Sequence, residues 1–86
     1  MDRYFFRIEY GEVTEDVIGI DLPNVAAASA SAVQLASEIL KDEGDGFWTK
    51  PDLTVTVTDA GNLTLWTLSI TGRAAPSVAA TRRMAG

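Results

Sequence analysis

The sequence predicts a small α+β domain with two layers, in which one helix packs on a mainly antiparallel sheet in the order β-β-α-β-β. Two observations lead to this prediction. Apolar residues recur with period two in three short segments, as they do in strands with one buried face, and less regularly in a fourth. Between the second and third of these segments, apolar residues recur at the spacing of one helix face. A single helix can cover one face of such a sheet.

The first half of the sheet is expected within the first 22 residues. Residues 3–10 alternate, with Tyr and Phe side chains on the buried side, and Gly11 ends the strand. The acidic stretch 12–16 is interpreted as a charged loop. Period two then returns over residues 17–22, which predicts a short second strand that forms a hairpin with the first. We expect the first strand to lie at the centre of the sheet because it is strongly apolar.

A helix is predicted directly after this second strand. Pro23 ends the strand, since proline has no N–H, and Asn24 is a favourable N-cap. Gly44 is the predicted C-terminal cap. We expect the alanines of the helix to lie close to the sheet and its larger residues to fill the deeper core. The apolar stripe consists of Val25, Ala28, Ala32, Leu35, Ala36, Ile39 and Leu40.

The last two strands are predicted on either side of a tight turn at residues 59–62. Residues 53–58 alternate cleanly between Leu or Val and Thr, and the preceding Lys50-Pro51 favours an edge position. The returning strand, residues 63–70, allows two interpretations. Without a bulge, Trp66 lies on the face away from the helix. A bulge near Trp66 returns the following apolar residues to the core and leaves Trp66 at a rim.

Length and charge limit the possible organisation and partners. A chain of 86 residues forms one domain, which we place at residues 1–72, followed by a flexible tail at residues 73–86. The first 72 residues carry four basic and twelve acidic side chains, a net charge of −8, whereas the tail carries +3. A negative body repels phosphate backbones, so we expect no nucleic-acid binding by the folded domain. Neither a signal peptide nor a membrane span is indicated, which favours a cytoplasmic protein.

The residue types that most often carry chemistry are missing. The sequence contains no cysteine and no histidine, which excludes thiolate nucleophiles, disulfides and imidazole bases or ligands. The acidic residues near Gly44 lack the spacing of a calcium-binding loop. We therefore predict no catalytic residue, no metal site and no cofactor, and a protein that is not an enzyme.

Two groups of residues are candidates for binding. The first is a possible interaction face on the side of the sheet away from the helix, where aromatic residues and an arginine accompany threonines. It consists of Phe5, Arg7, Thr54, Thr56 and Trp66. The second is a possible pocket rim at Phe47 and Trp48, although the alternative, Trp48 as a lid over the open end of the core, is favoured. The leading hypothesis is a non-enzymatic protein-interaction or regulatory module that buries the outer face or an edge strand against a protein partner or a second copy. The alternative is a small-molecule-binding domain with a pocket near the helix C-terminus.

Several short motifs together resemble one small family. They are Arg3-Tyr4-Phe5-Phe6, Gly11, the Asp16-x-x-Gly19 turn, Leu22-Pro23-Asn24 before an alanine-rich helix, and Val57-Thr58-Asp59-x-Gly61 before an apolar strand. This order is similar to that of a domain of unknown function in rhizobial and related alphaproteobacterial proteins. Members usually have histidine where this chain has Arg7 and aspartate where it has Asn24. The resemblance covers nearly the whole predicted domain and implies its fold, while it implies no activity.

Overall fold

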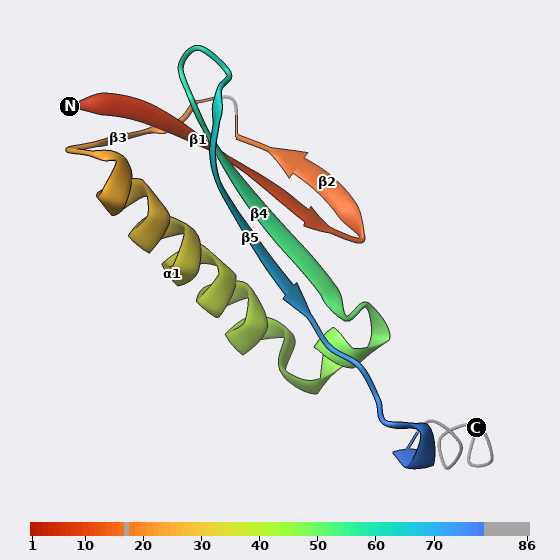
Figure 1. Cartoon of the computed structure of the whole chain (residues 1–86). Helices are drawn as coiled ribbons and strands as arrows, with labels where there is room; N and C mark the ends of the chain where they lie inside the picture. Colours follow the sequence, from red (N-terminus) through yellow and green to blue (C-terminus); the bar gives the residue numbers. More distant parts are fainter. Residues whose placement is uncertain (17, 79–86) are drawn as a thin grey trace.

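A computed structural model describes residues 1–16 and 18–78. It has two layers, with one long helix lying across one face of a sheet (Figure 1), which confirms the predicted α+β fold. The elements, in chain order, are β1 (Asp2–Tyr10), β2 (Glu12–Glu15), β3 (Ile20–Leu22), α1 (Val25–Glu43), the 3₁₀ helix η1 (Gly44–Thr49), β4 (Asp52–Asp59) and β5 (Thr64–Thr71).

All strand pairs in the sheet are antiparallel, and the strand order is β2-β1-β4-β5. The short strand β3 pairs with the first residues of β1, on the same side of β1 as β2. The central position predicted for the first strand is confirmed. The edge position predicted for β4 is wrong, because β4 lies between β1 and β5. Pro51 precedes the strand and takes part in pairing only through its carbonyl, which accepts a hydrogen bond from Gly72 N–H at 2.8 Å.

Two short strands, β2 and β3, pair with β1 on the side away from β4, and the sequence did not predict this interruption. Its first part, β2, is the acidic stretch whose composition indicated a loop. The chain reverses at Gly11, which has a φ of 74°, so that Tyr10 pairs with Glu12. The register then shifts by two residues between the pairs Arg7–Glu15 and Tyr4–Ile20. The ladder therefore contains a bulge between β2 and β3, before which Asp16 N–H still donates to the Phe6 carbonyl of β1 at 3.1 Å.

The predicted caps of α1 are confirmed. The Asn24 side chain accepts a hydrogen bond from Ala27 N–H at 2.8 Å, and Gly44 N–H donates to the carbonyl of Leu40. The packing of the helix differs from the prediction. Its fully buried residues are the alanines 28, 32 and 36, whereas Leu35, Ile39 and Leu40 are only partly buried. Because alanine lets the helix approach closely, the larger core side chains come from the strands, above all Leu53, Val55 and Val57 of β4.

The hairpin between β4 and β5 forms at the predicted turn. The Asp59 carboxylate accepts hydrogen bonds from the N–H groups of Gly61 and Leu63, both at 2.9 Å. A register shift follows, because Thr58 pairs with Thr64 while Val57 pairs with Trp66. The extra residue in this bulge is Leu65, so the bulge lies just before the position that the sequence suggested. Beyond it, Leu68 and Ile70 pair with core residues of β4 and lie on the helix side.

After β5 the chain continues as an extended segment into one helical turn at residues 76–78. The rest of the tail predicted at residues 73–86 lies outside the described residues. Within residues 1–16 and 18–78, no helix has the length and apolar character needed to cross a membrane.

Candidate functional site

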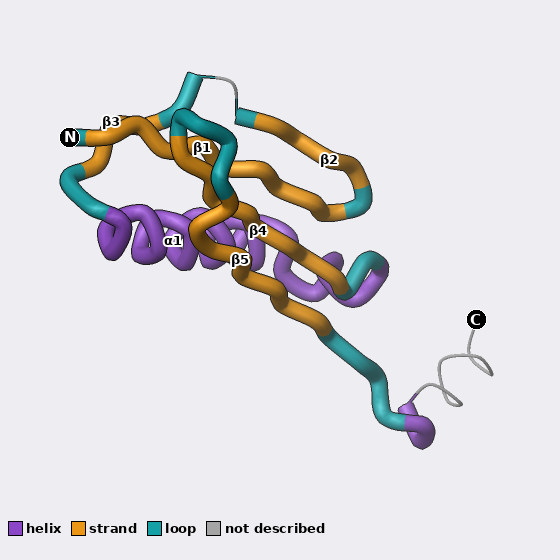
Figure 2. Tube along the Cα trace, turned by 45° about the horizontal axis from the view of Figure 1, so that its top comes forward, coloured by secondary structure: helices purple, strands orange, loops and turns teal. Residues whose placement is uncertain are grey.

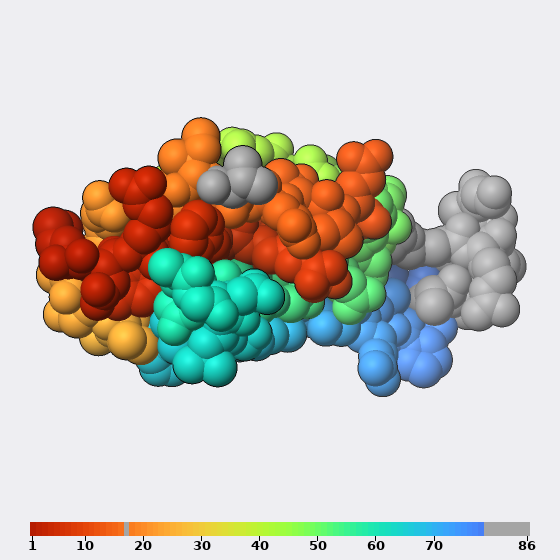
Figure 3. Space-filling view, turned by 90° about the horizontal axis from the view of Figure 1, so that it is seen from above, coloured from red at the N-terminus to blue at the C-terminus, as the bar shows by residue number. Residues whose placement is uncertain are grey.

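Four of the five residues predicted for the interaction face do share the sheet face opposite the helix. Phe5 pairs with Thr58, Arg7 with Thr56, and Thr54 lies one row further along β4. These side chains alternate with the buried residues of the same strands, so they point away from α1. Figure 3 looks onto this face, with the β4–β5 hairpin loop in teal beside β1 in red.

A shallow groove of about 540 Å³ crosses this face between β1, β4 and the hairpin loop. Phe5, Arg7 and Thr56 line it together with carboxylates from β2 and the turns. The Arg7 guanidinium is 3.5 Å from a carboxylate oxygen of Glu15 and 3.9 Å from one of Glu9, so its charge is largely balanced within the chain. Among the described residues, no three acidic side chains gather closely enough to hold a metal ion.

Trp66 does not belong to the outer face, so this part of the prediction is wrong. It pairs with the buried Val57 and therefore lies on the helix side of β5. Its indole N–H donates a hydrogen bond to the carbonyl of Val25 in the first turn of α1, at 3.0 Å. The bulge at Leu65 causes this placement, because one extra residue moves the following side chains to the other face. Trp66 is still 42% exposed.

Phe47 and Trp48, the predicted pocket rim, close one end of the core. Phe47 is buried and stacks on Tyr10, with ring centroids 5.9 Å apart. Trp48 meets Phe47 edge to face and covers Gly72, where an added Cβ would lie 2.7 Å from the Trp48 ring. Two surface pockets, of about 540 and 370 Å³, lie elsewhere. This geometry favours the lid interpretation, and it leaves Trp48 47% exposed.

Tyr10 ties this lid to the end of α1. Its hydroxyl donates a 2.6 Å hydrogen bond to the Glu43 carboxylate, and this bond, with smaller effects of desolvation and of the Glu43 charge, raises the pKa of Tyr10 to about 12. The folded state thus favours the neutral phenol. This contribution to stability is fully present below about pH 10, the ordinary tyrosine pKa, and is lost as the pH rises toward 12.

Removing the acceptor charge tests this link. We expect Glu43→Gln to lower the pKa of Tyr10 toward 10, because a neutral amide stabilises the phenol proton less than a carboxylate does. The titration can be followed by NMR at the Tyr10 ring carbon that bears the hydroxyl. Glu38→Gln, an exposed substitution on the same helix, is the matched control and should leave the titration unchanged. An unchanged pKa in Glu43→Gln would contradict the assigned bond.

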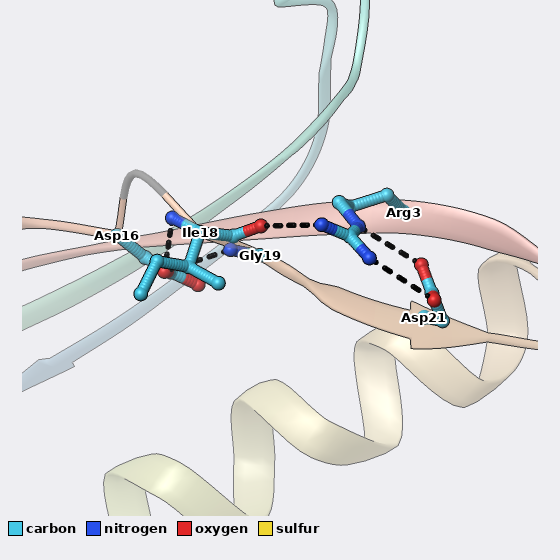
Figure 4. A network of polar contacts seen from close by, with 5 residues as sticks. All are labelled: Arg3, Asp16, Ile18, Gly19 and Asp21. Carbon is cyan, nitrogen blue, oxygen red and sulfur yellow. Dashed lines mark hydrogen bonds and ion pairs between the residues drawn. The ribbon is translucent and has the colours of Figure 1, made fainter.

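The two edges of the sheet differ in how open they are, and the edge formed by β2 and β3 is blocked. Arg3 clamps the bulge by donating to both carboxylate oxygens of Asp21, at 3.0 and 3.2 Å, and to the Ile18 carbonyl at 3.2 Å (Figure 4). These hydrogen bonds hold the pKa of the Asp21 carboxyl below its ordinary value. Asp16 closes the turn by accepting from the N–H groups of Ile18 and Gly19. Short strands, a bulge and acidic side chains are the usual protection of an edge against strand pairing.

Among the described residues, no strand pairs with β5 on the side away from β4, so the opposite edge is open there. Figure 2 shows β5 and β2 on opposite sides of the sheet. Gly72 N–H bonds to Pro51 in register with the β4–β5 ladder, so residues 66, 68 and 70 direct their backbone groups toward β4. Residues 67, 69 and 71 therefore direct theirs outward. Within the described part of the chain, the backbone hydrogen bonds outside regular elements include none to these three residues.

Comparison with known proteins identifies the family. A family model described as a domain of unknown function, DUF6894, matches residues 3–71. The chain belongs to this family. No curated protein and no solved structure matched the chain.

Sequence reasoning missed the outward-facing backbone of this DUF6894 domain, at Thr67, Ser69 and Thr71. A signal was present, since residues 60–72 contain no charged residue and no proline. Natural edge strands commonly carry Lys, Pro or other interruptions that prevent pairing. The strand order that places β5 at the edge was not available from the sequence, so the signal did not distinguish an open edge from a covered strand.

Proposed function

We propose that this DUF6894 domain is a non-enzymatic protein-interaction module that binds an extended partner strand along β5. The observation that supports the proposal best is the open edge of β5 beyond the bulge at Leu65, because none of the eight residues of this strand is charged or a proline. Such an edge offers backbone donors and acceptors at the spacing of a strand, and strand addition is a recurring mode of peptide recognition.

The chemistry of the edge indicates the partner that would fit. Thr67, Ser69 and Thr71 can each exchange two backbone hydrogen bonds with an antiparallel strand, and each bond contributes about 0.5–1.5 kcal/mol net. On the helix side, Trp66, Leu68 and Ile70 offer apolar surface to alternate side chains of the partner. The best fit is an uncharged strand that alternates apolar and hydroxyl side chains.

The edge is favoured over the outer face as the binding surface. With Trp66 on the helix side, the outer face offers mainly threonine, a partly buried Phe5 and an arginine that already has acidic partners. Such a surface lacks the aromatic anchors that usually provide binding energy.

A cytoplasmic location, the absence of nucleic-acid binding, and an origin in rhizobia or related alphaproteobacteria belong to the same proposal. The acidic composition and the quoted family motifs support them.

The test is to select ten-residue peptides that bind the domain and to map their site by NMR. We expect the binders to protect the amides of residues 67, 69 and 71 from hydrogen exchange. Ser69→Pro removes one outward N–H, at an edge position where proline is tolerated, and should weaken binding at least about tenfold. Ser69→Ala keeps this N–H and should bind normally. Binders that map to the groove beside Arg7, or that bind both variants equally, would contradict the proposal.

A further inference from the structure

We propose that the strand bound at β5 is β5 of a second copy, paired antiparallel across a two-fold axis at Ser69. This inference rests on the proposed function and specifies its partner. Pairing in this way joins the two sheets into one continuous sheet, with both helices on the same face. A two-fold interface uses the same patch on both subunits, so β5 must be complementary to itself.

The register follows from the backbone directions. Hydrogen-bonded pairs must join outward-facing residues, which are 67, 69 and 71, and the bulge at Leu65 ends the regular ladder on one side. Full use of these three positions places Ser69 opposite Ser69 of the other copy and Thr67 opposite Thr71. This alignment forms three hydrogen-bonded pairs. It also keeps the helix-side residues of both strands on one face, because even-numbered residues pair with even-numbered residues and odd-numbered residues with odd-numbered ones.

This alignment explains why Trp48 and Trp66 are about half exposed in the single chain. Trp66 lies near the start of β5 and would stand opposite Gly72 of the other copy. Gly72 has no side chain, and the ring of Trp48 covers it. Trp66 of one copy therefore meets Trp48 of the other, and the two-fold axis generates this contact twice. Between these contacts, Leu68 faces Ile70. In the single chain Trp66 is 42% and Trp48 47% exposed, and tryptophan is enriched among residues that dominate binding.

The distribution of charge selects this edge for self-association. Each chain carries a net charge of −5, so two copies repel each other unless they meet where charge is absent. Residues 60–72 provide such a neutral region. The same operation on the opposite edge would bring the acidic residues Glu12, Glu15 and Asp21 of both copies together. Like charges opposite each other destabilise strand pairs.

A charge exchange at the axis tests the inference. Ser69 is exposed, so Ser69→Lys and Ser69→Glu should leave the single chain folded. We expect the unmodified chain to be a dimer by light scattering at about 100 µM, whereas each variant alone places like charges together and should dissociate about 100-fold more readily. An equal mixture of the two variants should restore a dimer. Ser69→Ala is the neutral control and should remain dimeric.

The alternative results separate this inference from the proposed function. A chain that stays monomeric at about 1 mM but binds selected peptides at residues 67–71 would overturn the second copy and leave the interaction module standing. A dimer that both charged variants retain would overturn the inference, because it would use another surface. A second measurement is cross-linking of Ser69→Cys. Residues paired at the axis lie about 5.5 Å apart between Cα atoms, within disulfide range, and Leu68→Cys, displaced from the axis, should cross-link much less.

Discussion

Replacing Leu53 with alanine will bring the domain close to unfolding. Leu53 is 1% exposed and lies in the central strand β4, opposite Ile70. Truncating a buried leucine removes apolar contacts and leaves a cavity, which together cost about 2–5 kcal/mol. Small domains have a total stability of about 5–15 kcal/mol, and a chain of this size belongs near the lower limit. Urea denaturation should show a large decrease of the midpoint.

Two further leucines provide matched controls for this substitution. Leu63 is 63% exposed in the hairpin, so Leu63→Ala should change the unfolding free energy by no more than about 0.5 kcal/mol. Leu35 is partly buried on α1, and Leu35→Ala should fall between the other two. All three are best measured in the Ser69→Lys chain, because dimer formation would otherwise add to the apparent stability. A larger loss for Leu35 than for Leu53 would show that the helix, not β4, provides the deep core.

Local patterns predicted those elements whose own residues determine them. The faces of β1 and β4 follow directly from alternation, because one face of each strand is buried and the other is not. The caps at Asn24 and Gly44 depend on bonds within a few residues, so they were also predictable. By contrast, β2 is exposed along its whole length. A strand with no buried face has no alternation to detect, and its acidic residues resembled a loop.

The features that define the candidate site depend on distant parts of the chain. Whether a strand lies at an edge is decided by its neighbours. Lys50-Pro51 suggested that β4 is an edge strand, but Pro51 lies before β4 begins at Asp52, so it does not prevent pairing on either side of the strand. The face of Trp66 depends on a single extra residue, Leu65, in a strand where both faces carry apolar residues. The sequence therefore identified the aromatic residues of interest. It did not specify that Trp48 and Trp66 lie at the two ends of one open edge.

Gly19→Ala will destabilise the domain more than the same substitution at Gly44 or Gly46. Gly19 has a φ of 80°, and an added Cβ would lie 2.7 Å from an Arg3 side-chain carbon, 2.9 Å from the Phe5 ring and 3.0 Å from the Tyr4 carbonyl oxygen. Backbone strain of this kind costs about 1–3 kcal/mol, and forced overpacking costs about 1–3 kcal/mol more. The loss should appear as a lower midpoint of thermal unfolding.

The other two glycines separate the causes of this loss. Gly44 also has a positive φ, of 55°, but nothing lies within 4 Å of an added Cβ, so Gly44→Ala reports backbone strain alone. At Gly46 the φ is not positive and the space is open, so Gly46→Ala should be close to neutral. The expected order of destabilisation is Gly19, then Gly44, then Gly46. Equal losses at Gly19 and Gly44 would mean that Arg3 and Phe5 move aside at no cost. The bulge would then pack loosely against β1, and the hydrogen bonds of Arg3 and Asp16 would be left to hold the β2–β3 edge closed.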